Sequence, residues 1–148
     1  MKNLFLSLLI LLTSFSVKSQ NSDFPYSQKD YLITMYEVVE VVEDLYNTYG
    51  EDTSVVNKLM ELSSSKVYVL SGLGTIDDRF NKSAAIEEWF VPTINRSCDY
   101  LPTTVTVIEK ECDKWGVWFR VKVTNMYGVN NYIDFGINKE NKLRSIIL

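Results

Sequence analysis

The first long periodic segment of the chain predicts an amphipathic helix from Asp30 to Tyr49. Its apolar residues recur at intervals of three and four positions, which places them on one helical face. Further apolar residues widen that face, so we expect much of the helix circumference to be covered. Asp30 is the expected cap at the start of this helix, and Gly50 is expected to end it. The apolar face consists of Leu32, Met35, Val39, Val42, Tyr46 and Tyr49, widened by Val38, Val41 and Leu45.

Two shorter helices and a short strand are predicted next. A helix over residues 52–62 carries its own apolar face and ends at the three serines that follow. The β-branched and aromatic run Lys66–Leu70 predicts a short strand that leads into a glycine-rich turn. Ser83 is the expected cap of a third helix, which Pro92 is expected to end or kink near its last turn.

The remainder of the chain alternates strands with turns. In its longest predicted strand, apolar residues alternate with Trp118 and polar residues, so that one face is buried and the other is wetter. Helices that precede a run of strands indicate an α+β fold, with an antiparallel sheet and the helices gathered on one face. The predicted strands are Thr103–Glu111, Trp115–Met126, Asn130–Ile137 and Leu143–Leu148.

The N-terminus has the three parts of a secretory signal peptide. Lys2 precedes the apolar stretch 4–12, and a polar exit with small residues follows. The apolar stretch falls short of the roughly 20 residues that span a bilayer. We therefore expect a cleaved signal peptide at 1–19, a flexible lead at 20–29 and one domain at 30–148. The mature protein is expected to be periplasmic or extracellular, without a membrane anchor.

Charge and composition exclude several classes of function. The chain carries 15 basic and 19 acidic residues, and loss of the two leader lysines makes the balance more negative. An acidic surface repels phosphate backbones, so no nucleic-acid partner is expected. The chain has no histidine, which removes the commonest metal ligand and the usual general base. We expect no metal site, no cofactor and no Ser-His-Asp triad.

The two cysteines, Cys98 and Cys112, are the candidates for a disulfide in an exported protein. They flank the predicted strand Thr103–Glu111. An extended strand of that length separates them by far more than the Cα distance of roughly 6 Å that a disulfide needs. A bulge or bend in the strand would be required to bring them together.

Three segments of the chain resemble the nuclear transport factor 2 (NTF2)-like superfamily, closest to its SnoaL-like branch. Val67–Gly74 and Lys82–Phe90 match a glycine-rich turn before a small-residue helix, and Asp134–Ile147 is similar to the final hairpin of these proteins. The resemblance implies a curved sheet wrapped around helices into a cystatin-like cone, open at one end to an apolar pocket. It also implies a homodimer through the sheet. Residues Ser19 and Gln20 after the leader are similar to those of exported Bacteroidetes-type bacterial proteins.

Enzymes of this superfamily use Asp, His or Tyr side chains for acid–base chemistry. Here no histidine is present and no catalytic motif matches position by position. Asp134 is the first candidate for a general base, because an acid inside a strand is otherwise out of place. Tyr68 or Tyr132 would donate a hydrogen bond to a developing oxyanion. The alternative is that Asp134 faces solvent or pairs with Arg120 on a neighbouring strand.

Aromatic side chains are the candidates for lining a ligand cavity. Tyr36, Tyr46, Trp89 and Trp118 are the predicted ligand-binding residues, and Tyr68, Trp115 and Tyr132 are further candidates. The alternative is that the aromatic residues form the core and a dimer interface. Trp118 stands out because it falls among the polar positions of its alternating strand. A large aromatic side chain on that face needs a ligand or a partner surface to cover it.

These observations favour an exported, non-catalytic domain that binds a small apolar or amphipathic molecule, or a partner protein, in an apolar pocket. The first alternative is an acid–base enzyme of the cyclase or isomerase type that uses a pocket carboxylate. The second is a dimerisation platform whose pocket is filled by its own side chains.

Overall fold

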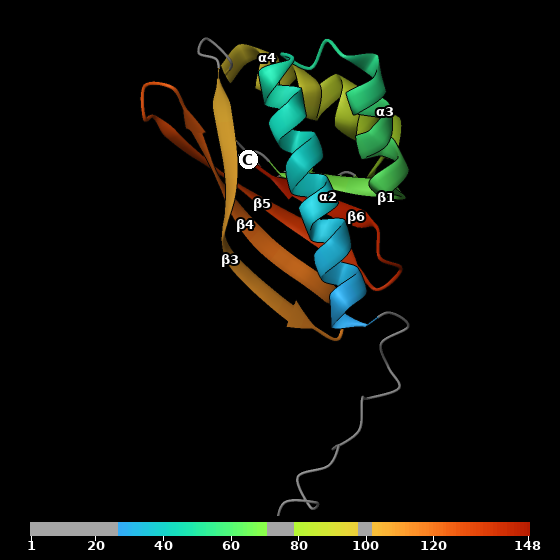
Figure 1. The fold of residues 1–148 in the computed structure, drawn as a ribbon. Coiled ribbons are helices and arrows are strands. Elements are labelled where there is room, and N and C mark those ends of the chain that lie inside the picture. The colour runs from blue at the N-terminus through green and yellow to red at the C-terminus, as the bar shows by residue number, and fades with distance from the viewer. Residues whose placement is uncertain (1–26, 71–78, 98–101) are drawn as a thin grey trace, which may run out of the picture.

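One sheet of six strands forms the framework of the structure (Figure 1). The structure is a computed structural model, and it describes residues 27–70, 79–97 and 102–148. The strands are β1 (Ser63–Leu70), β2 (Arg79–Asn81), β3 (Thr103–Asp113), β4 (Gly116–Asn125), β5 (Asn130–Asn138) and β6 (Leu143–Ile147). The helices are α2 (Gln28–Asn47), α3 (Thr53–Leu62), the π-helical stretch η1 (Ala84–Phe90) and α4 (Val91–Ser97). The expected α+β class is confirmed.

The sheet is mixed, and the prediction of a wholly antiparallel sheet was wrong. Its strands follow the order β2-β1-β6-β5-β4-β3, in which β3 to β6 form the expected antiparallel meander. β1 joins the sheet beside the last strand and runs parallel to it. The chain between them, which contains η1, α4 and the other strands, makes the long connection that parallel neighbours require. The short strand β2, which pairs with β1, was not predicted.

Two helices begin at caps that differ from the expected ones. Helix α2 is capped by Ser27, and Asp30 occupies the third helical position, where its carboxylate accepts from the Ser27 backbone N–H at 2.9 Å. This is a reciprocal capping box, and its hydrogen bonds hold the pKa of Asp30 below its usual value. At the third helix, Asn81 rather than Ser83 accepts from the Ala84 N–H, at 2.8 Å.

Pro92 does not end its helix, contrary to the prediction. It is the second residue of α4, which continues directly from η1. Proline is tolerated in the first turn of a helix, where its missing N–H costs little. The preceding turns are wide, since the Val91 N–H donates to the Ile86 carbonyl five residues back. The change of helix type therefore accommodates the proline, and the expected kink at Pro92 stays a prediction.

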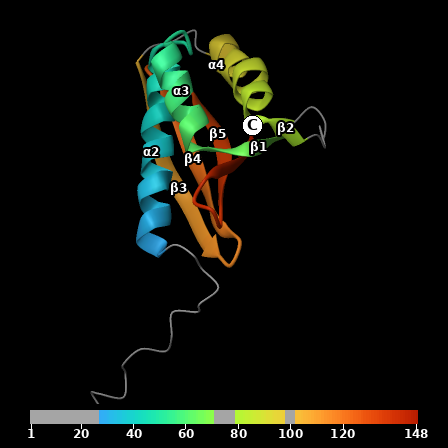
Figure 2. The same cartoon turned by 90° about the vertical axis from the view of Figure 1, so that its right-hand side faces the viewer.

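The core lies between the helices and one face of the sheet. Phe90, Phe119 and Phe135 are fully buried there. The Phe119 and Phe135 rings stack at 5.3 Å between centroids, and Phe90 meets Phe135 edge-on at 6.1 Å. Helix α2 runs along this face beside β3 and β4, as the two views of the fold show (Figures 1 and 2). No helix within the described residues is long and apolar enough to cross a bilayer.

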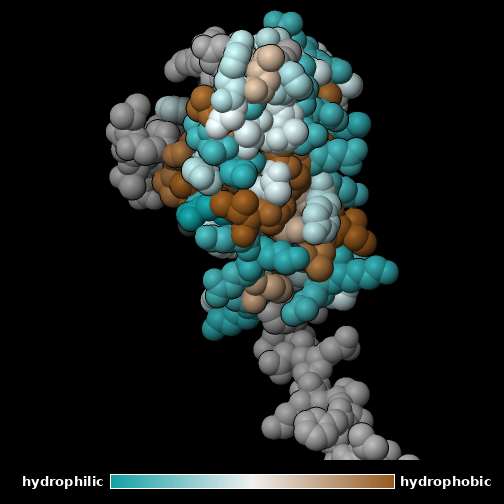
Figure 3. Space-filling model, turned by 60° about the vertical axis from the view of Figure 1, so that its left-hand side comes forward, coloured by the Kyte–Doolittle hydropathy of each residue, from teal (hydrophilic) through white to brown (hydrophobic). Residues whose placement is uncertain are grey.

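The edge strand β3 is covered by side chains of α2 over its first residues. The Asn47 side chain accepts from the Thr103 N–H and donates to the Thr103 carbonyl, each at 2.9 Å. Glu43 accepts from the Val105 N–H at 2.7 Å. Further along β3, Ile108 is 43% exposed. Seen from this side of the molecule, hydrophobic residues gather in the middle of the surface between hydrophilic ones (Figure 3).

Candidate ligand-binding site on the open face of the sheet

The side of the sheet that faces away from the phenylalanine core carries a mixed set of aromatic, charged and small residues. We call this side the open face. Successive residues of a strand point to opposite sides, so the neighbours of the buried Phe119 and Phe135 fall on it. The residues of the open face used below are Tyr68, Trp118, Arg120, Tyr132, Asp134, Gly136 and Ser145.

A hollow of about 260 Å³ opens on this face. Gly136 forms part of its floor, in register between Trp118 on β4 and Ser145 on β6. Gly116 lies two residues before Trp118 on the same strand and leaves a second position without a side chain. The hollow is therefore a place where two side chains are missing from an otherwise covered sheet. Its lining is completed by Glu111, Asp113, Trp115, Val117, Ile137, Asn138 and Arg144.

The two floor glycines differ in how strictly their surroundings require them. Gly116 has φ +137°, and a Cβ at this position would lie 1.8 Å from the Ile137 carbonyl oxygen. That oxygen belongs to the backbone and has no room to move, so no other residue fits without a shift of the sheet. A Cβ on Gly136 would lie 2.3 Å from the Ser145 Oγ, which rotation about a single bond can move away.

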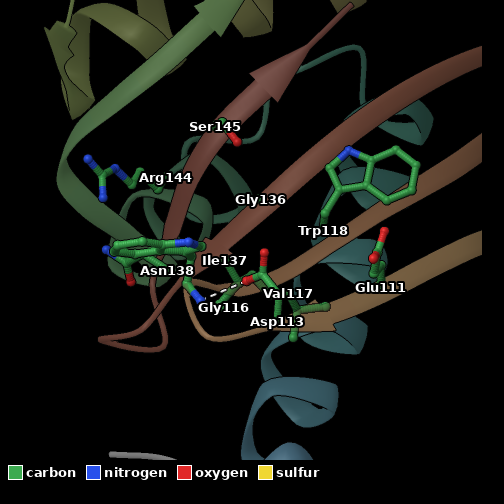
Figure 4. Close-up of a pocket in the computed structure, with 11 residues that line it drawn as sticks. Glu111, Asp113, Gly116, Val117, Trp118, Gly136, Ile137, Asn138, Arg144 and Ser145 are labelled. Atoms are coloured by element: carbon green, nitrogen blue, oxygen red, sulfur yellow. Dashed lines mark hydrogen bonds between the residues drawn. The ribbon is translucent and has the colours of Figure 1, made fainter. Parts of the chain in front are cut away.

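The walls of the hollow combine aromatic and polar side chains. Trp118 and Arg144 stand on opposite sides, with Gly136 and Ser145 between them (Figure 4). Trp115, from the β3–β4 turn, is 67% exposed. Large exposed rings around a depression are typical of a surface that binds another molecule.

Each aromatic ring around the hollow is paired with a cation. The Arg120 guanidinium carbon lies 5.4 Å from the Trp118 ring centroid, and the Lys114 ammonium lies 5.2 Å from that of Trp115. The distances fit cation–π contacts, which hold the orientation of the rings. The Arg144 guanidinium carbon lies 5.4 Å from the ring centroid of Tyr68, on the neighbouring strand β1.

A row of three charged side chains, Glu109, Arg120 and Asp134, crosses the open face beside the hollow; we call it the charged ladder. Arg120 binds Asp134 through two hydrogen bonds, Nε to Oδ1 at 2.6 Å and Nη2 to Oδ2 at 2.9 Å. Its Nη1 lies 3.6 Å from a carboxylate oxygen of Glu109 on β3. The hydrogen bond with Asp134 raises the pKa of Arg120, and the charges of Asp134 and Glu109 raise it further. The ladder fixes the guanidinium that covers Trp118.

The candidate catalytic residues lie on the open face, but Asp134 has the partner that the alternative interpretation foresaw. Both of its carboxylate oxygens accept from Arg120. Tyr132 lies two residues before Asp134 on β5 and is 54% exposed. Tyr68, on β1, lies beside Arg144, on β6. Roles in proton transfer for these three residues stay predictions.

The four predicted ligand-binding aromatics do not share one cavity. Tyr46 is buried in the core on α2, and Tyr36 on the same helix is 57% exposed. Trp89 packs against the core from η1. Trp118 lies on the opposite side of the sheet. Of the four, Trp118 alone lines the hollow described above.

Two further expectations concern cysteines and metals. Cys112 is exposed near the end of β3, whereas Cys98 lies outside the described residues, so their pairing is untested. Partial burial raises the pKa of the Cys112 thiol, and the charge of Asp113 adds to this effect. Within residues 27–70, 79–97 and 102–148, no group of three or more acidic or cysteine side chains is arranged to hold a metal ion.

Comparisons with known proteins give likenesses of fold alone. No family model matches the chain, and no curated protein does. The chain is similar to the solved structure of "Rd1NTF2_04 with long sheet" at 15% identity and a TM-score of 0.48, over 76% of this chain and 96% of that one. It is similar to an NTF2-like protein of unknown function from Cytophaga hutchinsonii at 9% identity and a TM-score of 0.47, over 88% and 91% of the two chains.

A third similar structure is an uncharacterised cystatin-fold protein from Novosphingobium aromaticivorans. Its identity is 12% and its TM-score 0.47, over 79% of this chain and 95% of that one. The solved structures similar to the chain thus include NTF2-like and cystatin-fold proteins. These likenesses are too distant to bear on function, and membership of the SnoaL-like branch stays a prediction.

Proposed function

We propose that the mature chain is an exported, non-catalytic binding domain that holds a small ligand in the hollow on the open face. The observation that carries this proposal is the glycine floor of the hollow between the Trp118 ring and the Arg144 guanidinium (Figure 4). Export rests on the leader sequence at residues 1–19.

The proposal assigns the ligand to the open face rather than to the space between helices and sheet because of how the helix-facing side is filled. Phe90, Phe119 and Phe135 occupy that side and are fully buried against one another. The hollow of about 260 Å³ is smaller than ordinary enclosed ligand sites, which span roughly 300–1,000 Å³. It suits one small ring, or one unit of a longer molecule that continues over the surface.

The surroundings of Asp134 favour binding over acid–base catalysis. A general base needs a carboxylate oxygen that can reach and accept a substrate proton. Both oxygens of Asp134 already accept from Arg120 in a bidentate contact, so a substrate proton would have to compete with the guanidinium for them. The enzyme alternative predicts that Asp134→Asn abolishes turnover of a substrate without loss of folding.

Native mass spectrometry of protein purified after export tests the proposal. Wild type and Tyr132→Ala, an open-face variant outside the hollow, should carry an added mass that dissociates on denaturation. Trp118→Ala should lack that mass because one wall of the hollow is gone. A bare wild-type protein, or an adduct retained by Trp118→Ala, would contradict the proposal. The denatured mass also tests export, since cleavage should leave Gln20 or Asn21 as the first residue.

A homodimer through the sheet is a rival use of the same surface. Trp118 and Tyr132 both lie on the open face, and a second copy seated there would cover them. Sedimentation velocity of wild type and Trp118→Ser separates the two uses. A stable dimer that Trp118→Ser dissociates would identify the open face as a subunit interface and would overturn the ligand site.

A further inference from the structure

We infer that the hollow on the open face binds one unit of a neutral saccharide. The inference rests on the proposed function and names the chemical class of its ligand. Three features of the lining point to this class: an aromatic wall, a balance of charge, and polar groups around the floor.

The aromatic wall provides a surface for the flat side of a sugar ring. A pyranose carries several C–H groups on one face, and burial of these groups against an indole is favourable although the sugar is polar overall. The cation–π contacts of Trp118 and Trp115 with Arg120 and Lys114 occupy part of the aromatic surface and orient both indoles. The Trp118 side chain borders the hollow and is available for stacking there.

The charges around the hollow favour a neutral ligand. An anion would meet the carboxylates of Glu111 and Asp113, and a cation would meet the guanidinium of Arg144. Two of these charges are already engaged with neighbouring groups. Asp113 accepts from the Trp115 backbone N–H at 2.7 Å, and Arg144 lies over the Tyr68 ring. A ligand of either sign is therefore opposed by part of the lining.

The same polar groups suit hydroxyl groups, which donate and accept hydrogen bonds. Arg144 offers donors and the Ser145 hydroxyl offers both donor and acceptor, from β6, and Glu111 offers acceptors from β3 (Figure 4). A planar hydrocarbon ring would use the Trp118 wall but would remove these groups from water without replacing their hydrogen bonds. A sugar can stack on the Trp118 ring and form hydrogen bonds with these polar groups at the same time.

The floor sets the size of the bound unit. Gly136 lets a ring approach the backbone between Trp118 and Ser145, where any side chain would fill the space. The hollow is open to solvent along the sheet, so the units on either side of the bound one can extend over the surface. A chain of several sugars is therefore the expected ligand.

Isothermal titration of the mature protein with defined hexasaccharides tests the inference. The neutral probes are the hexamers of β-1,4-glucose, β-1,3-glucose, β-1,4-mannose and β-1,4-xylose. The charged probes are hexagalacturonate and the glucosamine hexamer. At least one neutral hexamer should bind, and both charged hexamers should bind about tenfold more weakly than that one, or not at all.

Three variants locate the site on the protein. Trp118→Ala and Gly136→Ala should each weaken the neutral hexamer by about tenfold or more, the first by removing the stacking ring and the second by filling the floor. Ile33→Ala, at an exposed position of α2 on the helix-covered side of the sheet, should bind within about twofold of wild type. Urea unfolding of each variant verifies that it is folded, and Gly136→Ala is expected to remain folded because only the Ser145 hydroxyl must rotate.

Two results would overturn the inference. In the first, no neutral hexamer binds; in the second, a charged hexamer binds as tightly as the best neutral one. If the exported protein still carries an adduct that Trp118→Ala loses, the proposed binding function stands and the saccharide class alone is wrong. If it carries none and no hexamer binds, the binding function itself is wrong.

Discussion

Truncation of Phe135 to alanine should be among the most destabilising single changes in this protein. The Phe135 side chain has no exposed surface, and it contacts two other rings. The Phe119 ring stacks on it at 5.3 Å with 26° between the planes, and the Phe90 ring meets it at 6.1 Å with 88° between the planes. All three residues come from different elements, so the variant loosens η1, β4 and β5 together.

The expected cost follows from burial and ring contacts. A buried Phe→Ala change costs about 3–5 kcal/mol, and aromatic pairs add about 0.5–1.5 kcal/mol beyond their buried area. We therefore expect a loss near the upper end, about 4–5 kcal/mol, of the roughly 6–18 kcal/mol typical of a domain of this size. With a urea m-value near 1.5 kcal/mol/M, the unfolding midpoint should fall by about 3 M.

Equilibrium urea unfolding, followed by far-ultraviolet circular dichroism, measures this loss. Tyr132→Ala is the matched control, because Tyr132 lies on the same strand but is 54% exposed. It should change stability by about 0.5 kcal/mol or less. A loss below about 1.5 kcal/mol for Phe135→Ala would refute the account of the core. It would mean that the helix-facing side of the sheet has spare room, as an interior ligand pocket requires.

The other predictions concern a floor glycine and a thiol. Gly116→Ala should destabilise the protein far more than Gly136→Ala, because a Cβ on residue 116 would lie 1.8 Å from the Ile137 carbonyl oxygen. Urea unfolding midpoints of the two variants measure the difference. Equal midpoints would contradict the assigned geometry. Cys112, in a chain without the other cysteine, should react with iodoacetamide at pH 8 more slowly than an ordinary exposed thiol, because its raised pKa leaves less thiolate. Asp113→Asn should lower that pKa and speed the reaction, and an unchanged rate would refute the contribution of the Asp113 charge, leaving burial as the cause.

Local patterns in the sequence predicted most of the secondary structure correctly. The alternation of apolar residues around Val117 and Phe119 gave both the strand and its buried face, because side chains in a strand alternate with period two. Helix caps were less accurate. Asp30 and Ser83 were expected caps, whereas Ser27 and Asn81 fill these roles. Ser, Asp and Asn all favour the position, so composition does not choose between close neighbours.

The place of β1 in the sheet was beyond the reach of local patterns, whereas the meander from β3 to β6 was expected. β1 and β6 are separated by most of the domain in sequence, and nothing in either strand specifies a parallel partner. The bulge in their pairing also shifts the register between Ser63 and Tyr68. Such long-range pairing depends on how the helices pack against the sheet, which is a property of the whole chain.

The candidate site was predicted in part. Trp118 was identified because a large aromatic residue occupied a polar position, and it lines the hollow. Gly116 and Gly136 were missed, although a glycine within a strand often marks a close approach of another group. Arg144 and Ser145 gave no signal in the sequence. They reach the hollow through the register of β6 with β5, which the structure shows.

The central claim, that the open face binds the ligand, is tested most directly by the three tryptophan indole N–H signals in NMR spectra. Spectra of the exported protein are compared before and after removal of the bound molecule by denaturation and refolding. The account predicts that the signals of Trp115 and Trp118 shift, while that of Trp89, which packs against the core, stays in place. A shift confined to Trp89 would place the ligand between the helices and the sheet, and three unchanged signals would show that the open face holds none.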